Sequence, residues 1–274
     1  MVTVLAPARA ARPVREGALS ALARHSAVQT QRLLLRWARD PLTVTQALLF
    51  PALLLAMLNT VLGRQISAFA GHSALYGTVP MTALVGVMSG SVAGAITLGR
   101  ERDAGLLARL WVLPVHRASG LVSRILAELV RILVTTAAIL VVGHVLGFRF
   151  AQGIAGALGF LVVALLYGLA FATMVTAVAL FTANLALVEA VSLGSALLMF
   201  FSSGFVPLAA YPGWARPIVE HQPLTYAVDA MRGLSLGGPV LAPMLGLILW
   251  CATILAVCAG PAVVGFRRAS RTTA

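Results

Sequence analysis

Six long apolar runs constrain this chain more than any other feature of its sequence. They cover residues 43–62, 79–98, 125–146, 154–181, 185–205 and 240–266. Each run is near or above the roughly 20 residues that an α-helix needs to cross the hydrocarbon core of a bilayer. Because backbone polar groups in lipid must be bonded within the protein, runs of this length predict helices. The sequence therefore predicts an all-α integral membrane protein with six transmembrane helices.

The arginines give these runs an orientation. All 20 basic residues are arginines, and they flank the apolar runs instead of forming one polar face, which argues against nucleic-acid binding. With the N-terminus inside, seven arginines precede the first run, six lie between residues 100 and 131, and three follow the last run, against four on outer segments. The positive-inside rule then predicts a protein of the cytoplasmic membrane with both termini in the cytoplasm.

The segment between the second and third runs, LGRERDAGLLARLWVLPVHR at 98–117, carries the densest charge of the chain. Each ion buried in a bilayer costs roughly 2.5–3.5 kcal/mol, so we expect this segment in water on the cytoplasmic side. At about 100° per residue, its leucines and Trp111 lie opposite Arg102 and Arg109, and Pro114 ends the turn because it lacks an N–H. We predict a short amphipathic helix there, with an ordinary positive-inside loop as the alternative.

A second amphipathic helix is predicted at residues 18–40, ended by the pair Asp40-Pro41. Its apolar and basic faces comprise Leu19, Leu22, Leu33 and Trp37, and Arg24, Arg32, Arg36 and Arg39. This pattern is typical of a helix that lies among lipid headgroups; a basic tail without membrane contact is the alternative. Residues 1–17 are predicted to be a disordered cytoplasmic tail, to which we assign no role. Residues 267–274 are predicted to form a second cytoplasmic tail.

Two patterns within the runs predict contacts between or along helices. Gly86, Gly90 and Gly94 repeat at every fourth position, a face that lets another helix approach closely. That helix belongs either to the same chain or to a second copy, and the sequence leaves both open. In the third run, Glu128 and Arg131 lie one turn apart and are expected to pair.

The segment between the fifth and sixth runs, residues 206–239, is long, apolar and interrupted by prolines. Its aromatic residues Tyr211, Trp214 and Tyr226 suit the headgroup level of a membrane. A short helix is predicted over 224–236, with Asp229 and Arg232 on one face and able to pair. We expect two short re-entrant or interfacial helices at the outer surface.

No catalytic constellation is present in the sequence. It lacks the His-Glu-x-x-His motif of zinc proteases, and it has no buried run of carboxylates of the kind found in ion-coupled transporters. It also lacks Lys, which a P-loop needs for the β- and γ-phosphates, so any ATP-driven work requires ATP on another chain. Cys251 and Cys258 would lie about 10 Å apart along a helix, beyond the roughly 7 Å reach of a disulfide.

Two motifs carry a family resemblance. RERDAGLLARLWVLPVHR at 100–117 and PLTYAVDAMRGL at 223–234 resemble the two hallmarks of type-2 ABC exporter permeases, in the expected order, and the likeness covers about residues 30–268. The phrases LLARLWVLPVHRASGL, FSSGFVPLAAYPGW and MRGLSLGGPV are similar to mycobacterial members of the daunorubicin-resistance family.

This resemblance implies a permease subunit that is not itself an enzyme and binds no cofactor. Two permease chains, identical or with a sister permease of the DrrB type, would each dock on a separate ATP-binding subunit of the DrrA type, which would hold ATP and Mg²⁺. The residues implied in ATPase coupling are Arg100, Glu101, Arg102, Gly105, Leu106, Leu110 and Pro114, with Arg32, Arg36 and Trp37 on the N-terminal helix. Those implied at the outer exit are Tyr211, Trp214, Tyr226, Asp229 and Arg232.

The implied cargo is amphiphilic. Anthracycline-type drugs and, for mycobacterial members, the wax-like lipid phthiocerol dimycocerosate both suit a greasy path, and no sequence rule separates them. The alternatives from other classes are a membrane-embedded enzyme of lipid metabolism or proteolysis and a scaffold that transports nothing.

Overall fold

The computed structural model describes residues 19–106, 118–181, 185–204, 206 and 208–271, and every regular element among them is helical. Five segments are long and apolar enough to cross a membrane: Pro41–Ala68, Leu75–Asp103, Ser119–Val145, Gly153–Phe181 and Leu241–Phe266. The prediction of an all-helical, multi-pass protein is thus confirmed for these residues. The predicted disordered tail at 1–17 and most of the predicted surface helix, residues 107–117, lie outside them.

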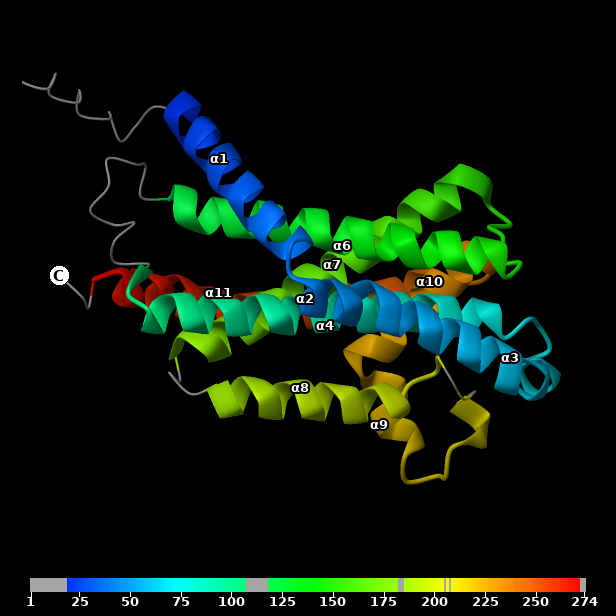
Figure 1. The fold of residues 1–274 in the computed structure, drawn as a ribbon. Coiled ribbons are helices and arrows are strands. Elements are labelled where there is room, and N and C mark those ends of the chain that lie inside the picture. Colours follow the sequence, from blue (N-terminus) through cyan, green and yellow to red (C-terminus); the bar gives the residue numbers. More distant parts are fainter. Residues whose placement is uncertain (1–18, 107–117, 182–184, 205, 207, 272–274) are drawn as a thin grey trace, which may run out of the picture.

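The long helices run along a common axis, and α1 is inclined to it (Figure 1). The elements are α1 (Leu19–Ala38), α2 (Pro41–Val44), the π-helix η1 (Thr45–Leu49), α3 (Phe50–Ala70), α4 (Leu75–Asp103), α6 (Ser119–Val145), α7 (Gly153–Phe181), α8 (Leu185–Phe200), the 3-10 helix η2 (Leu208–Ala210), α9 (Arg216–His221), α10 (Pro223–Leu236) and α11 (Leu241–Arg271). We call the two ends of the bundle the α1 end and the α9 end. The last helix continues into the predicted tail at 267–274 as far as Arg271.

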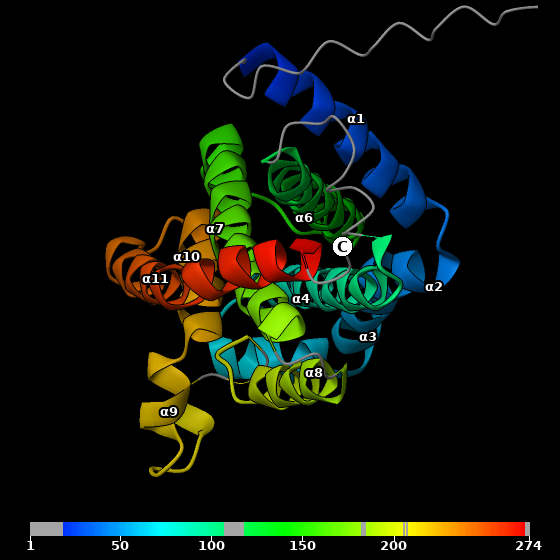
Figure 2. The same ribbon diagram turned by 90° about the vertical axis from the view of Figure 1, so that its left-hand side faces the viewer.

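Helix α4 lies in the middle of the bundle, with α3, α6, α7, α8 and α10 packed against it (Figure 2). Nearly all of its residues from Leu75 to Val92 are buried. By contrast, α3 and α11 expose large apolar side chains such as Phe50, Leu53 and Leu249, as expected of helices that face lipid. The core of the protein is therefore built around α4.

The proline in the first run is accommodated by a π-helix. Pro51 has no N–H for the carbonyl of Ala47, and the chain forms the wider turns of η1 immediately before it, with Phe50 N–H donating to the carbonyl of Thr45. π-Helical segments of this kind often interrupt α-helices. A Cβ on Gly86 would lie 2.8 Å from the Ala47 carbonyl oxygen. Gly86 therefore lets α4 pack directly against the irregular turn before Pro51.

The fifth predicted run forms a shorter helix than expected. Helix α8 has 16 residues and ends at Phe200, so the predicted end at 205 was wrong. At 1.5 Å per residue it spans about 24 Å, less than the roughly 30 Å of hydrocarbon. The helix stops because side chains from the following segment bond the carbonyls of residues 200–203 and replace the helical N–H groups.

Candidate functional site

One buried carboxylate joins three helices at the α1 end. Glu101, in the last turn of α4, is 4% exposed. Its Oε1 lies 2.7 Å from Nη1 of Arg36 on α1, and its Oε2 pairs with Arg124 on α6. The Arg124 guanidinium also lies 5.9 Å from the ring centroid of Phe266 on α11, within cation–π range. We call Arg36, Glu101 and Arg124 the Glu101 network.

The next arginine ties α4 to the end of α7. Arg102 Nη1 donates to the carbonyls of Ala179 and Leu180, at 2.8 and 3.4 Å, and its other nitrogens bond Asp103. The last carbonyls of a helix lack helical partners and carry partial negative charge, which a guanidinium satisfies. Arg100, predicted with these two, is exposed.

The chain turns sharply where it leaves α4. Gly105 has φ +68°, in the left-handed region, and its N–H donates to the Arg102 carbonyl at 2.9 Å. Glycine adopts this conformation without the steric cost other residues meet. Leu106 is half-buried beside it. Leu110 and Pro114, the other predicted coupling residues, lie outside the described residues.

A second charged group lies deeper along α6. Ser91 on α4 donates to Glu128 Oε1 at 2.5 Å, and Arg131 pairs with Glu128 Oε2, the ion pair that their spacing predicts. We call Ser91, Glu128 and Arg131 the Glu128 network. A Cβ on Gly94 would lie 2.7 and 2.9 Å from the Arg131 guanidinium nitrogens. Gly94 therefore makes room for a charge, not for a helix backbone.

The other two glycines of that repeat behave differently. A Cβ on Gly86 would meet Thr135 Cγ2 on α6 at 2.7 Å, whereas one on Gly90 would meet nothing closer than Ala47 Cβ at 3.8 Å. Gly86 thus packs helices within this chain, and Gly90 is not required for any close contact among the described residues.

Helix α1 packs on α6 along a partly polar face. Gln29 Nε2 donates to Ser119 Oγ at 3.2 Å, and Thr30 Oγ1 donates to the Ser123 carbonyl at 3.3 Å. Arg32 is exposed and Trp37 is half-buried, but Arg36 turns toward Glu101. Arg36 lies on the face for which the sequence predicted contact with lipid headgroups, and it pairs instead with the buried Glu101.

A cavity of about 300 Å³ lies between these networks. We call it the donor-lined cavity. Its wall combines Arg36, Arg124 and Arg131 with apolar residues of α1, α4, α6, α7 and α11, among them Leu33, Trp37, Ile125, Leu169 and Leu255. Asp40 also lines it and caps α2 by accepting from Leu42 N–H and Thr43 N–H. The Thr43 hydroxyl also donates to this carboxylate, and its hydrogen bond has the largest effect on the Asp40 pKa. Together these hydrogen bonds hold the pKa of Asp40 below its ordinary value.

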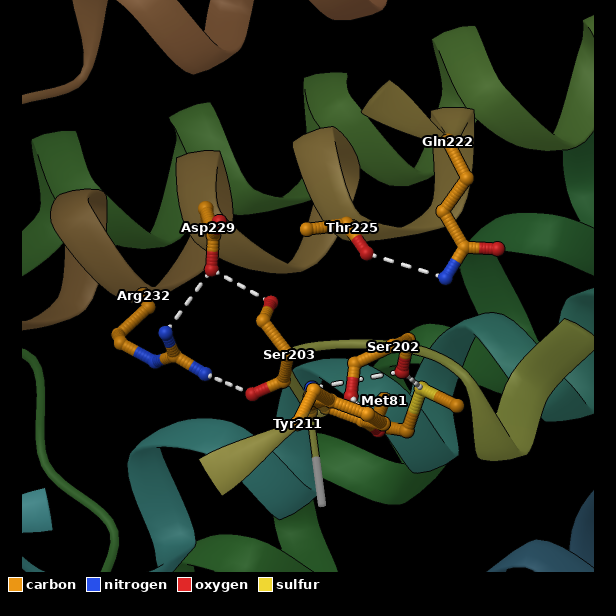
Figure 3. Close-up of polar contacts among 9 residues, drawn as sticks. Met81, Ser202, Ser203, Tyr211, Gln222, Thr225, Asp229 and Arg232 are labelled. Carbon is orange, nitrogen blue, oxygen red and sulfur yellow. Dashed lines mark hydrogen bonds and ion pairs between the residues drawn. The ribbon is translucent and has the colours of Figure 1, made fainter. Parts of the chain in front are cut away.

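At the α9 end, side chains hold a stretch of non-helical backbone after α8 (Figure 3). The Tyr211 hydroxyl lies 2.8 Å from the Phe200 carbonyl and 3.1 Å from that of Ser202. Gln222 Nε2 donates to the Phe201 carbonyl. Non-helical backbone at membrane depth is tolerated only where protein or water bonds it. These side chains provide such bonds for three consecutive carbonyls.

The fourth carbonyl is held by an ion pair on α10. Arg232 Nη2 donates to the Ser203 carbonyl at 2.5 Å and its Nη1 lies 2.8 Å from Asp229 Oδ1, which also accepts from the Ser203 hydroxyl at 2.6 Å. The pairing of Asp229 with Arg232 follows their spacing, as predicted. We call Tyr211, Gln222, Asp229 and Arg232, with the 200–204 segment they bind, the loop clamp.

Glycine allows the loop clamp to rest on α4. A Cβ on Gly77 would lie 2.7 Å from the Gly204 carbonyl oxygen, and one on Gly204 would lie 2.8 Å from Met81 Cβ. The three aromatic residues predicted at headgroup level have different surroundings. Trp214 is 70% exposed, Tyr211 is buried in the loop clamp, and Tyr226 packs its ring on Gly246 of α11.

A second cavity, of about 470 Å³, lies beside the loop clamp between α4, α7, α8, α9 and α11. We call it the apolar cavity. It is lined by Met88, Phe171, Met174, Leu198 and Ile254, with the Tyr167 hydroxyl bonded to Met88 sulfur and Trp250 Nε1 donating to the His221 carbonyl at 2.8 Å. Its polar donors are thus already bonded.

Sequence reasoning assigned no contact to Arg124, Ser91, Ser203 or Gln222. Arg124 entered only the count of inner arginines, although a lone Glu101 within an arginine cluster indicates that some arginine pairs with it. The run Ser202-Ser203-Gly204 within an apolar stretch was a usable signal that the helix ends there, since serines bond nearby backbone outside helices.

Comparison with known proteins agrees with this architecture. The profile of the family described as ABC-2 type transporter matches residues 27–236. The chain is 52% identical over 266 residues, 97% of its length and 96% of the relative's, to the "Probable doxorubicin resistance ABC transporter permease protein DrrC" of Mycobacterium tuberculosis, in strains CDC 1551 and H37Rv. It is 26% identical over 229 residues, 82% of this chain and 78% of the relative, to the "Daunorubicin resistance ABC transporter permease protein DrrB1" of Streptomyces coeruleorubidus.

These findings confirm the resemblance read from the two motifs, with DrrC as the nearer type and DrrB as the more distant one. A permease of this kind is the membrane subunit, is not itself catalytic, and associates with an ATP-binding subunit. The chain therefore belongs to the ABC-2 type transporter family, as a permease of the drug-resistance group.

Proposed function

We propose that this chain is one membrane half of an ATP-driven exporter that moves amphiphilic molecules out of the cytoplasmic membrane. ATP and Mg²⁺ bind a separate DrrA-type subunit. A second permease completes the exporter and is either an identical chain or a DrrB-type sister. The relatives' names favour an anthracycline-type drug. A complex envelope lipid such as phthiocerol dimycocerosate is the second cargo, and the nearly uncharged lining of the apolar cavity suits the body of either molecule.

The observation that carries this proposal is the Glu101 network. It joins α1, α4 and α6 where the chain leaves α4 for the arginine-rich segment at 100–117. A force applied to that segment by an ATP-binding subunit reaches three helices through one carboxylate. Arg102 extends the connection to the end of α7.

We infer six crossings with the α1 end in the cytoplasm. Helix α8 begins four residues after α7 ends, and the segment that follows it reaches Gly77 and Met81 near the start of α4. Together they traverse most of the bundle. The sixteen-to-four distribution of arginines favours the α1 side as cytoplasmic.

Cysteine labelling in intact cells tests this orientation. In a C251A/C258A background, Trp214→Cys at the α9 end is expected to react with an impermeant maleimide, because the side chain is exposed. Arg100→Cys, exposed at the α1 end, is expected to react only after permeabilisation. The reverse pattern would invert the proposed topology and remove the basis for ATPase contact.

Transport is tested in inside-out vesicles that contain the chain and its ATP-binding subunit, with and without a DrrB-type permease. ATP-dependent uptake of doxorubicin is measured by fluorescence, and transfer of labelled phthiocerol dimycocerosate is measured to acceptor vesicles. Glu101→Gln is expected to lower transport about tenfold while the subunits still associate, and Glu189→Gln, at an exposed glutamate on α8, serves as the matched control. Transport of neither cargo by the unmodified complex would contradict the proposal, and transport of one identifies it.

A further inference from the structure

The donor-lined cavity has buried hydrogen-bond donors in the residues of its wall. Trp37 Nε1 and Arg131 Nε are buried, and neither has a hydrogen-bond partner in the part of the chain that the structure describes. Among the described residues, Arg131 donates one hydrogen bond, to Glu128, although a guanidinium has five N–H groups. Buried donors are bonded in the great majority of proteins. Both donors belong to residues that line the cavity, one on α1 and one on α6.

The carboxylates beside this cavity already accept hydrogen bonds from the protein. Glu128 accepts from Ser91 and Arg131, and Glu101 accepts from Arg36 and Arg124. The Asp40 carboxylate accepts from the start of α2. A molecule that fits the cavity must bring acceptor oxygens, and an arginine with free N–H groups favours an oxyanion.

The remaining wall is apolar and continues onto the outside of the bundle. Ile125 lines the cavity and is also 42% exposed. Val134 and Val141, which lie beyond Arg131 toward the α9 end of α6, are 41% and 64% exposed. The cavity, at about 300 Å³, lies at the lower end of the range for small-molecule sites. It suits a polar head whose apolar chains lie along α6.

We propose that the donor-lined cavity binds the head group of an anionic phospholipid from the leaflet at the α1 end. The phosphate accepts hydrogen bonds from Arg131 and Trp37, and the acyl chains lie against the exposed apolar face of α6. This site is separate from the apolar cavity and does not depend on the proposed cargo. Because α1 and α6 both contribute donors, the lipid bridges the same helices as the Glu101 network.

Native mass spectrometry of the full chain tests this site. The protein is extracted from nanodiscs that contain equal amounts of phosphatidylglycerol and phosphatidylcholine, and the retained lipids are counted. We expect about one phosphatidylglycerol per chain, retained about tenfold over phosphatidylcholine because only the former carries net charge. Arg131→Gln and Trp37→Phe are each expected to lower that retention about fivefold or more.

The matched controls remove the same groups elsewhere. Arg64→Gln and Trp214→Phe change exposed side chains and are expected to leave retention unchanged. Trp37→Phe keeps an aromatic ring and removes the N–H together with the five-membered part of the indole. Trp214→Phe makes the same change elsewhere, so the pair decides the matter if Arg131→Gln does not fold. Equal retention of both lipids, or unchanged retention in Trp37→Phe, would overturn the proposal. Loss of the bound lipid on addition of millimolar inorganic phosphate would show that the cavity binds a free anion. This result would also overturn the proposal.

Discussion

The two ends of the bundle hold their polar groups in different ways. At the α9 end, the loop clamp bonds side chains to backbone carbonyls, and Gly77 and Gly204 bring the backbones of α4 and the clamped segment into direct contact. At the α1 end, the Glu101 network joins side chains of three helices, and Ser91 of α4 bonds the Glu128–Arg131 pair of α6, with a cavity between the two networks. Arg102 is the exception at this end, because it bonds carbonyls of α7.

This difference indicates which end is built to change shape. A side chain that bonds a backbone carbonyl cannot leave without exposing that carbonyl to the membrane. An ion pair between two helices can exchange partners while both helices stay intact. The α9 end is therefore expected to be rigid, and the α1 end, which the proposed ATPase contacts, is expected to accommodate movement of α1 against α4 and α6.

The largest effect is expected from Glu101→Gln, which leaves Arg36 and Arg124 without their carboxylate. Removing one partner of a buried ion pair costs several kcal/mol, and because Arg36 is half-exposed we expect a loss of about 2–4 kcal/mol in the free energy of unfolding. Chemical denaturation in detergent measures it. Glu189→Gln is the control, expected to change the free energy by less than about 0.5 kcal/mol. Equal effects of the two variants would show that the network contributes nothing.

The second-largest effect is expected at the α9 end, where the backbones of α4 and the clamped segment pack closely. Gly77→Ala places a methyl group 2.7 Å from the Gly204 carbonyl oxygen. Because neither backbone can move away easily, we expect the free energy of unfolding to fall by about 1–3 kcal/mol. Gly90→Ala, on the same helix with 3.8 Å to its nearest neighbour, is expected to be neutral or slightly stabilising. Thermal unfolding compares them. A Gly77→Ala protein as stable as the Gly90→Ala protein would show that the α9 end is not tightly packed.

Sequence periodicity and charge predicted the local features of this fold well. The apolar runs predicted five of the long helices because a membrane leaves few alternatives for such runs. Spacing alone predicted the pairs Glu128–Arg131 and Asp229–Arg232, because residues three apart on a helix are neighbours.

Contacts between distant segments were beyond the same reasoning. The partners Arg36–Glu101 are 65 residues apart and Gln222–Phe201 are 21 apart, and no period in the sequence connects them. The glycine repeat shows the same limit. Gly86, Gly90 and Gly94 look equivalent in sequence, yet one packs a helix, one has space around it, and one accommodates a guanidinium.

A smaller effect is expected within the loop clamp from Gln222→Met, which keeps the volume and removes the donor to the Phe201 carbonyl. A buried carbonyl left without a donor costs about 1–2 kcal/mol here, within the usual range for an unsatisfied group. Hydrogen exchange of residues 201–204 is expected to accelerate with it. Gln152→Met, at an exposed glutamine, controls for the change in side-chain type. Unchanged exchange would mean that Gln222 does not hold this segment.

The smallest effect concerns the pH dependence that Tyr211 gives to the loop clamp. Burial raises the pKa of the Tyr211 hydroxyl. Because the folded-state pKa is raised, the contribution to stability is complete below the ordinary tyrosine pKa of about 10 and is lost as pH rises through the folded value. Tyr211→Phe is expected to cost about 0.5–1.5 kcal/mol at neutral pH and to flatten the fall in stability above pH about 10. Tyr226→Phe, which changes a ring packed on Gly246 without a hydrogen bond to the clamped segment, is expected to keep the alkaline fall of the unmodified protein. If both variants fall equally with pH, the ionisation of Tyr211 is not linked to folding.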